Sequence, residues 1–227
     1  MSAIQPVAPP SPASRAMIIT LGGVALLSGF LLALTYQLTL PYIEANQRLA
    51  VERAVLKIYP QTETRVGFVL GANGLRPAET TAAPGEILVH AAYDKTGELR
   101  GLVAEAAAHG YAGVIRLLYG YTPECQCLTG ISVLQSTETP GFGDKISTDP
   151  DFIGNFRALD ARLNPDGSAL QHPIVTVKHG TKTEDWQVDA ISGATITSKA
   201  VGRMLNQSAQ ALLPGAVRDL DKIRRKP

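Results

Sequence analysis

The sequence predicts an α+β protein, in which a single N-terminal transmembrane helix is followed by a domain with a mainly antiparallel sheet and flanking helices. Three observations predict this fold class. The first is a segment without any charged residue, from position 16 to position 43. The second is a series of strand-like segments separated by turn residues, and the third is an amphipathic segment near the C-terminus.

The uncharged segment has the length of a membrane-spanning helix. Its most apolar part, Met17–Leu40, would span roughly 36 Å as a helix, and the hydrocarbon core of a bilayer is about 30 Å thick. Tyr36 and Tyr42 lie near its C-terminal end, where interfacial aromatic residues are common. The segment is too long for the apolar core of a signal peptide. We therefore expect residues 16–41 to form a transmembrane helix, preceded by a disordered tail at residues 1–15.

Composition excludes some classes of function. Charged residues make up only 18% of the 227 residues, which is low for a purely soluble domain and fits a membrane segment. The net charge is +1, and basic residues do not alternate with aromatic ones, so we expect no nucleic-acid partner. The four histidines lack the spacing of metal ligands, and we expect no metal site from them.

Residues 42–84 are expected to form a membrane-proximal helix and a connector. Apolar residues recur at near-helical spacing over Glu44–Tyr59, and Pro60 should end this helix. Gln61–Pro84 mixes polar residues with glycine and proline, which predicts an irregular connector.

Residues 85–215 are expected to form the folded domain. Its first half predicts a hairpin around Gly97 and two further strands with a turn between them, because apolar and β-branched segments flank turn residues. Their predicted strands are Ile87–Tyr93, Leu99–Ala107, Val114–Tyr121 and Leu128–Ser136. The second half predicts a short helix at Asp149–Leu159 capped by Asp149, a turn at Asn164–Gly167, strands at Ile174–Lys178 and Trp186–Ile191, and a helix from Thr197 to about Leu213.

The end of that last helix is expected at Pro214 and Gly215. Residues 216–227 would then form a basic, solvated C-terminal tail.

The segment from Ser192 to Ser198 joins the last predicted strand to the last predicted helix. Free backbone amides gather at a helix start, and the helix dipole favours negative charge there. Small residues would let a phosphate approach, and the hydroxyls of Thr195, Thr197 and Ser198 are close by in the chain. From the residues alone, two interpretations stay open: an anion site, and an ordinary helix cap in which a hydroxyl accepts a backbone hydrogen bond.

The run Asp189-x-x-Ser192-Gly-Ala-Thr195 resembles the flavinylation motif of the FMN-binding domain family. This family includes the G subunit of the Rnf (Rsx) electron transport complex and the C subunit of the sodium-translocating NADH:quinone reductase. The resemblance implies that a separate flavin transferase joins the phosphate of FMN to the hydroxyl of Thr195 as a phosphoester. It also implies a cofactor-binding role for the neighbouring residues, namely Ser192, Gly193, Ala194, Asp189, Thr197 and Ser198.

A second segment, Glu138–Gly143, is similar to the Glu-Thr-Pro-Gly-Leu-Gly segment of the same family. By itself the Pro-Gly pair would be typical of a surface turn. In the family this segment contributes to the flavin pocket, and Phe142 replaces the usual Leu here. The resemblance therefore adds six candidate cofactor-binding residues: Glu138, Thr139, Pro140, Gly141, Phe142 and Gly143. It covers roughly residues 16–213, and the segment order, the single helix and the length agree with the G subunit.

The expected function is electron transfer without a substrate site of its own. The chain shows no dinucleotide fingerprint, no set of cysteine clusters and no catalytic triad pattern, so no catalytic residue is expected. The resemblance implies a covalently flavinylated subunit of a membrane complex that couples electron transfer between ferredoxin and NAD to ion translocation, with the other subunits as partners. Two alternatives stay open: a C subunit of the quinone reductase, and a non-redox membrane-anchored anion-binding domain.

The resemblance also implies a location in the bacterial inner membrane, with a single span and a periplasmic large domain. Residues 1–15 would then be cytoplasmic. The positive charges alone weakly favour the opposite orientation, because Arg15 precedes the apolar segment whereas Arg48, Arg53 and Lys57 follow it.

The sequence leaves more than one role open for Cys125, Cys127 and Trp186. The two cysteines are too few and too close for a disulfide framework or a full zinc site. They could be free thiols in a loop, a strained disulfide in an oxidising compartment, or ligands to a metal or cluster shared with a partner. Trp186 could stack on a flavin ring or pack in the core.

Overall fold

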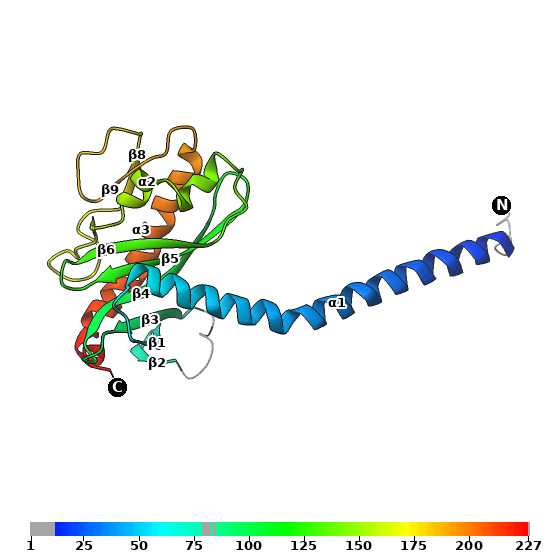
Figure 1. Ribbon diagram of the computed structural model, residues 1–227, viewed down its shortest axis with the longest axis horizontal. Helices are drawn as coiled ribbons and strands as arrows, with labels where there is room; N and C mark the ends of the chain where they lie inside the picture. The colour runs from blue at the N-terminus through cyan, green and yellow to red at the C-terminus, as the bar shows by residue number, and fades with distance from the viewer. Residues whose placement is uncertain (1–11, 79–82, 84, 227) are drawn as a thin grey trace, which may run out of the picture. The chain divides into compact units, whose positions relative to one another are not determined.

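The computed structural model describes residues 12–78, 83 and 85–226. The chain divides into two compact units, one ending at Leu49 and one beginning at Ala50. Helix α1 (Pro12–Ile58) starts in the first unit and ends in the second (Figure 1). The predicted transmembrane helix and membrane-proximal helix are therefore one continuous helix, which ends two residues before Pro60. Most of the predicted tail, residues 1–11, lies outside the described residues.

Helix α1 has the properties of a membrane anchor. Among the described residues it is the one helix long and apolar enough to cross a membrane. Its large apolar side chains, such as Leu26 and Leu32, are exposed, which is unfavourable in water and favourable in hydrocarbon. Pro41 lies inside the helix without ending it. The chain is thus a membrane-anchored protein.

The second unit contains a seven-stranded sheet in which every neighbouring pair is antiparallel. The strand order is β2-β1-β3-β4-β5-β6-β7. Gly97 has a φ of +78° in the turn between β3 and β4, as the predicted hairpin requires. The strands are β1 (Thr64–Gly71), β2 (Gly74–Pro77), β3 (Ile87–Tyr93), β4 (Leu99–His109), β5 (Val114–Thr122), β6 (Cys127–Gln135) and β7 (Leu159–Asp160).

The segment expected to be an irregular connector, Gln61–Pro84, contains strands β1 and β2 instead. Strand β1 pairs with β3 over seven residue pairs, and Phe68 and Val69 are buried in it. Gly67 and Gly71 interrupt the strand pattern in the sequence, and pairing with β3 compensates for their weak strand propensity. The sheet-bearing unit consequently begins well before residue 85, where the sequence placed the start of the domain.

Short elements follow the sheet. The 3-10 helix η1 (Gly143–Ser147) precedes α2 (Pro150–Gly154), and the Asp149 side chain caps α2 by accepting hydrogen bonds from the next amides, as predicted. Helix α2 is shorter than predicted, since it ends at Gly154, and the predicted last residue, Leu159, is the first residue of β7. Strands β8 (Val175–Val177) and β9 (Gln187–Asp189) form a separate parallel pair.

The last helices correct the prediction of a solvated tail. Helix α3 (Thr195–Arg218) begins two residues before the predicted start and continues through Pro214, and α4 (Leu220–Ile223) follows. Ile223 is buried, and its carbonyl accepts a hydrogen bond from the Tyr93 hydroxyl at 2.9 Å. The tail is therefore part of the core up to Ile223, because its apolar residues find partners in the sheet.

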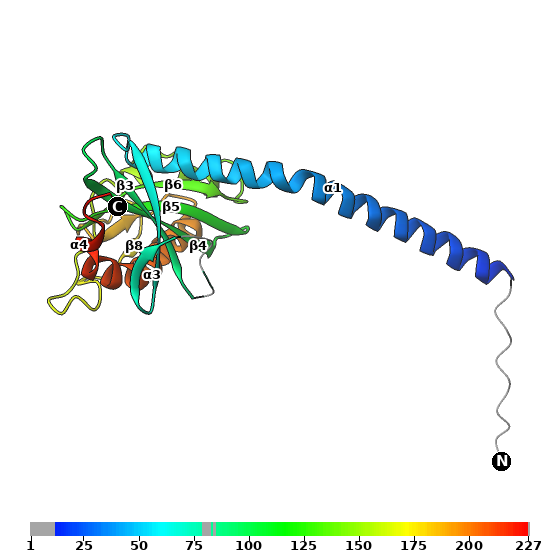
Figure 2. The same cartoon turned by 90° about the horizontal axis from the view of Figure 1, so that it is seen from below.

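The central strands β4 and β5 carry a layer on each face, since their side chains alternate in direction. Leu102 and Leu117 pack with α3 in the large core, whereas Val103 and Leu118 pack with the last turns of α1. Figures 1 and 2 show α3 and the end of α1 on opposite sides of these strands. On the face of the sheet that packs against α1, the Tyr59 hydroxyl also makes hydrogen bonds to two threonines, one in β5 and one in β6.

Candidate functional site

A cavity of about 470 Å³ lies at the end of the sheet where β5 begins and β6 ends. Three chain segments line it, and they are brought together only by folding. They are the loop before β5, the segment after β6 and the start of α3. Both motifs that the sequence analysis identified thus meet at one cavity. The lining residues are Tyr111, Glu138, Thr139, Phe142, Gly143, Gly193, Ala194, Thr195, Ile196 and Thr197.

Glu138 ties the three segments together. Its Oε2 accepts a hydrogen bond of 2.5 Å from the Thr197 hydroxyl, and its Oε1 accepts one of 3.0 Å from the Ala112 amide. The side chain is nearly buried, with 6% of its surface exposed. A Cβ at Gly143 would clash with both the Glu138 carboxylate and the Thr197 hydroxyl, so this close approach requires glycine. The carboxylate is therefore a structural centre of the site.

The environment of Glu138 favours its charged form. Burial raises the pKa of this carboxyl, but hydrogen bonds from the Thr197 hydroxyl and from three backbone amides outweigh burial. The pKa of Glu138 consequently lies below the ordinary glutamate value. At neutral pH the floor of the cavity holds an ionised carboxylate whose charge is shared among its donors.

Thr195 is the first residue of α3, at the edge of the cavity. The preceding turn needs Gly193 with a φ of +81°. The cap position is Ala194, and no side chain caps the helix there. The Thr195 side chain is exposed, and its hydroxyl has no hydrogen-bond partner among the described residues. Ordinary capping therefore does not explain this threonine, and the first amides of α3 remain free for a ligand.

Two of the other predicted residues make hydrogen bonds within the loops next to the cavity and do not face it. Ser198 is fully buried, and its Oγ accepts from the Ile191 amide and donates to the Ala194 carbonyl, both at 3.0 Å. Asp189 accepts a hydrogen bond of 2.8 Å from the Gly180 amide, and its Oδ2 lies 3.5 Å from Nδ1 of His179. Neither residue lines the cavity.

Ser192, Pro140 and Gly141 also lie outside the lining. Ser192 borders a separate cavity of about 250 Å³ together with Asp189. Pro140 and Gly141 form the middle of a turn in which the Phe142 amide donates to the Thr139 carbonyl at 3.2 Å. This turn presents Phe142 at the cavity.

Tyr111 and Ile196 line the cavity although the sequence analysis did not select them. Their side chains are 68% and 58% exposed, and Phe142 is 60% exposed. Three large apolar side chains thus stay accessible around one cavity, which is typical of a ligand site. In the sequence, Tyr111 follows Gly110 in the run Gly110-Tyr-x-Gly113-x-Ile115, which also resembles a segment of the family, and Ile196 follows Thr195.

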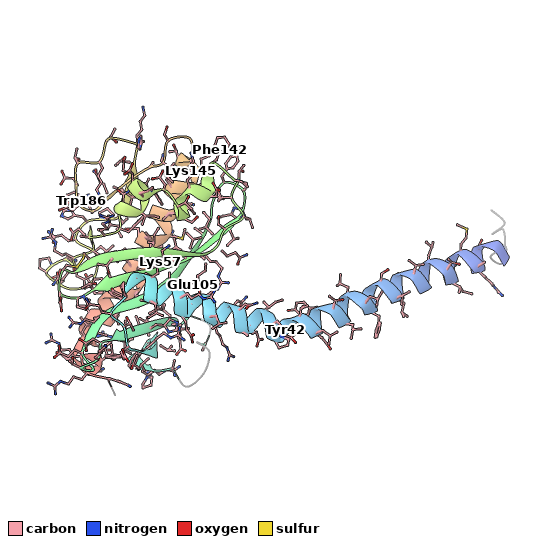
Figure 3. All side chains as sticks on the ribbon, viewed as in Figure 1. Tyr42, Lys57, Glu105, Phe142, Lys145 and Trp186 are labelled. Atoms are coloured by element: carbon pink, nitrogen blue, oxygen red, sulfur yellow. A yellow bond between two sulfur atoms is a disulfide. The ribbon has the colours of Figure 1, made fainter. Side chains whose placement is uncertain are left out.

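Trp186 does not belong to the cavity. Its ring stacks on His172, with the ring centroids 4.0 Å apart and the planes inclined by 14°. In Figure 3 it lies on the other side of the domain from Phe142. The interpretation as a flavin-stacking residue is not supported.

Cys125 and Cys127 are joined by a disulfide bond. Of the three interpretations left open by the sequence, the structure therefore agrees with the disulfide. Within the described part of the chain, no group of three or more His, Cys, Asp or Glu residues could hold a metal ion.

The fold and the cavity define a membrane-anchored protein with a ligand site at one end of its sheet. The model of the FMN-binding domain family matches residues 110–210, a range that contains all three lining segments. The chain belongs to the family of G subunits of ion-translocating oxidoreductase complexes.

Two relatives are G subunits, the first of which shows this membership, and one solved structure is similar in fold. The G subunit of the ion-translocating oxidoreductase complex of Methanosarcina acetivorans is 32% identical over 82% of this chain and 87% of its own length. The G subunit of the Na(+)-translocating ferredoxin:NAD(+) oxidoreductase complex of Acetobacterium woodii is 34% identical over 56% of each chain. The crystal structure of the C subunit of the Na(+)-translocating NADH-quinone reductase from Parabacteroides distasonis is 25% identical, with a TM-score of 0.54 over 69% of this chain and 78% of that one. The quinone-reductase protein is thus similar in fold, while the curated relatives that share about a third of the sequence are G subunits.

Proposed function

We propose that this chain carries one FMN, joined through its phosphate to the Thr195 hydroxyl, and transfers electrons within a membrane-bound ion-translocating complex. The observation that supports this most directly is the exposed Thr195 hydroxyl, which lacks a partner among the described residues and lies at the start of α3 on the cavity edge. A transferase can reach a hydroxyl of this kind, whereas the buried hydroxyls of Thr197 and Ser198 are engaged in hydrogen bonds.

The start of α3 suits the phosphate end of FMN. The first turn of the helix has free amides and no acidic residue, so both its hydrogen-bonding groups and its dipole favour an anion. Gly193 and Ala194 are small and would let phosphate oxygens approach the backbone. The nearby Glu138 carboxylate would repel a phosphate, but its charge is directed to four donors on the cavity floor.

The remainder of the cavity suits the flavin ring. Its volume lies within the range of about 300–1,000 Å³ usual for small-molecule sites. Tyr111, Phe142 and Ile196 offer apolar surface to a planar aromatic ring. FMN, when bound, supplies one- and two-electron transfer, and the protein contributes binding, orientation and electrostatics. We therefore assign this chain the role of an electron carrier without catalytic residues of its own.

The proposed partners are the other subunits of the complex and a flavin transferase. The name of the Acetobacterium relative supports electron transfer between ferredoxin and NAD coupled to ion translocation. We place the chain in a bacterial inner membrane with the sheet-bearing unit on the periplasmic side, where a flavin transferase would act. Reporter fusions at the two ends of the chain test this orientation, and a cytoplasmic C-terminal reporter would contradict it.

The attachment is tested by intact mass and in-gel flavin fluorescence of the full chain, produced together with a flavin transferase. The native chain should gain the mass of one FMN less one water, and Thr195→Ala should gain nothing. Thr139→Ala is the matched control, because Thr139 is an exposed threonine that lines the same cavity. It should keep its flavin, and all three proteins should have equal stability to within about 0.5 kcal/mol. A fluorescent, denatured Thr195→Ala chain would exclude this attachment point.

A further inference from the structure

The disulfide between Cys125 and Cys127 closes the turn between β5 and β6. The candidate FMN cavity lies at the other end of the same two strands. Strand β5 has nine residues, which separates the two places by roughly 26 Å at about 3.3 Å per residue. The disulfide is thus a second redox-capable group outside the site described above, and its chemistry does not depend on the flavin.

The two sulfur atoms differ in accessibility. Cys125 is exposed in the turn, where its sulfur lies 3.5 Å from the Thr122 carbonyl. Cys127 is 4% exposed, and as the first residue of β6 it pairs with Thr122 on one side and Asp160 on the other. A thiolate from another molecule can therefore reach Cys125 and not Cys127.

The backbone between the cysteines is in an unfavourable conformation. Gln126 has a φ of +52°, and it is the one residue other than glycine with a positive φ among those the structure describes. This region is disfavoured for residues that have a Cβ. The Gln126 carbonyl accepts a hydrogen bond of 3.0 Å from the Ala161 amide, which connects the turn to the chain just after β7. The ring of the disulfide includes Gln126, so we expect reduction to remove one constraint that holds this residue at a positive φ.

We propose that Cys125–Cys127 is an exchangeable disulfide that accepts two electrons from a protein dithiol. A thiolate of the dithiol attacks the Cys125 sulfur, the bond between Cys125 and Cys127 breaks, and the Cys127 thiolate leaves and takes up a proton. The second thiol of the dithiol then loses its proton and attacks the mixed disulfide, which releases Cys125 as a thiolate that is protonated in turn. The products are two cysteine thiols in this chain and one disulfide in the partner.

Reduction should also change the structure near β7. Without the ring, Gln126 can rotate, and its carbonyl loses the fixed direction that binds the Ala161 amide. The β6–β7 pairing consists of only two residue pairs, Cys127 with Asp160 and Leu128 with Leu159, so it depends strongly on this neighbouring hydrogen bond. The exchange site would thereby control the order of the segment that follows β7.

The first experiment titrates the purified full chain in detergent with mixtures of reduced and oxidised dithiothreitol, followed by acid quenching, maleimide labelling and intact mass. We expect two labels per chain at dithiol concentrations that leave the circular dichroism unchanged, and about ten-fold faster hydrogen exchange at the Ala161 amide. A disulfide that resists reduction until the domain unfolds would overturn the proposal.

The second experiment separates the roles of the two sulfur atoms. In Cys127→Ser the remaining thiol is exposed, and in Cys125→Ser it is buried. Oxidised glutathione should therefore form a mixed disulfide with Cys127→Ser at least about ten-fold faster than with Cys125→Ser. The double serine variant is the control and should gain no mass. Equal rates for the two single variants would contradict the assignment of Cys125 as the attacked sulfur.

Discussion

The two ends of the β5–β6 pair are held together in different ways. At the cavity end, the Glu138 carboxylate joins segments that are distant in the sequence, since 59 positions separate it from Thr197. At the turn end, a disulfide joins two residues that are two positions apart. The first arrangement needs the whole fold and makes the cavity rigid. The second is local, and we expect it to open while β5 and β6 stay paired, so that this pair of strands would have a fixed end and an adjustable end.

Approximate energies support this difference. Hydrogen bonds to a charged group contribute about 1.5–3 kcal/mol each, and Glu138 accepts several of them in a nearly buried position. A ring closed over three residues stabilises a protein by only about 1.6 kcal/mol in the chain-entropy model. The left-handed conformation of Gln126 costs about 1–2 kcal/mol and offsets this gain. Removal of the carboxylate should therefore have a large effect, whereas changes in the turn should have small ones.

The largest effect is expected for Glu138→Ala. The substitution leaves the Thr197 hydroxyl and the Ala112 amide without their acceptor, and it should lower the free energy of unfolding by about 3 kcal/mol. Urea denaturation of the full chain in detergent measures this change. Glu184→Ala, at an exposed glutamate, is the control and should stay within about 0.5 kcal/mol of the native chain. Equal stability of the two variants would show that Glu138 does not tie the cavity segments together.

The contribution of Glu138 should depend on pH. Its pKa is lower in the folded chain than in the unfolded chain, so its charged form stabilises the fold. This stabilisation is fully present above the ordinary glutamate pKa of 4.5 and is lost as the pH falls through the lower pKa of the folded state. The difference in unfolding free energy between the native chain and Glu138→Gln should therefore shrink below pH 4.5. A difference that grew toward acid pH would reverse the sign of the inferred shift.

An intermediate effect is expected for Thr197→Val. Valine has nearly the shape of threonine but cannot donate the 2.5 Å hydrogen bond to Glu138, so the variant should lose about 1.5–2 kcal/mol of stability. The pKa of Glu138 should rise toward the ordinary value at the same time, so the loss of stability in acid should become smaller and be complete at a higher pH. Thr197→Ser keeps the hydroxyl and should retain the native pH profile. If the serine and valine variants had the same profile, the loss would be one of packing and not of the hydrogen bond.

Much of the sheet could be predicted because its signals are local. Gly97 identifies the turn of the first hairpin, and Asp149 with Pro150 identifies the cap of α2. Strand β1 was missed because Gly67 and Gly71 weaken its pattern, and only pairing with β3 shows that it is a strand. The C-terminal tail was misjudged for the same reason, since nothing near Ile223 in the sequence indicates that Tyr93 binds its carbonyl.

The candidate site could also be predicted only in part from local signals in the sequence. The two motifs located Thr195 and Glu138, both of which line the cavity. Ser198 and Asp189 belong to the same motif by position, but their side chains hydrogen-bond within the loops behind it. Spacing along a chain cannot distinguish a residue that faces a cavity from one that supports its wall. Tyr111 became a candidate only when folding placed it beside Glu138.

The smallest effect is expected at the turn, for Gln126→Gly. Glycine accepts a positive φ without steric cost, so the substitution should remove most of the unfavourable backbone energy of the oxidised turn. Greater freedom of the unfolded chain offsets part of this gain, which leaves a net stabilisation of about 0.5–1 kcal/mol. Gln126→Ala keeps the Cβ and is the matched control, with no gain expected.

The turn variant also has a redox consequence that distinguishes the two ends of the strands. Glycine should favour the oxidised turn more than the reduced one, because we expect reduction to release residue 126 from the positive φ that it has in the oxidised turn. The equilibrium of Gln126→Gly with dithiothreitol should therefore shift toward the disulfide by a factor of about 2–5, since about 1.4 kcal/mol corresponds to a factor of ten. Glu138→Gln should leave this equilibrium unchanged. The separate contacts at the two ends of β5 and β6 indicate that the cavity end and the turn end are independent. A shift of equal size in both variants would instead mean that the two ends are coupled through these strands.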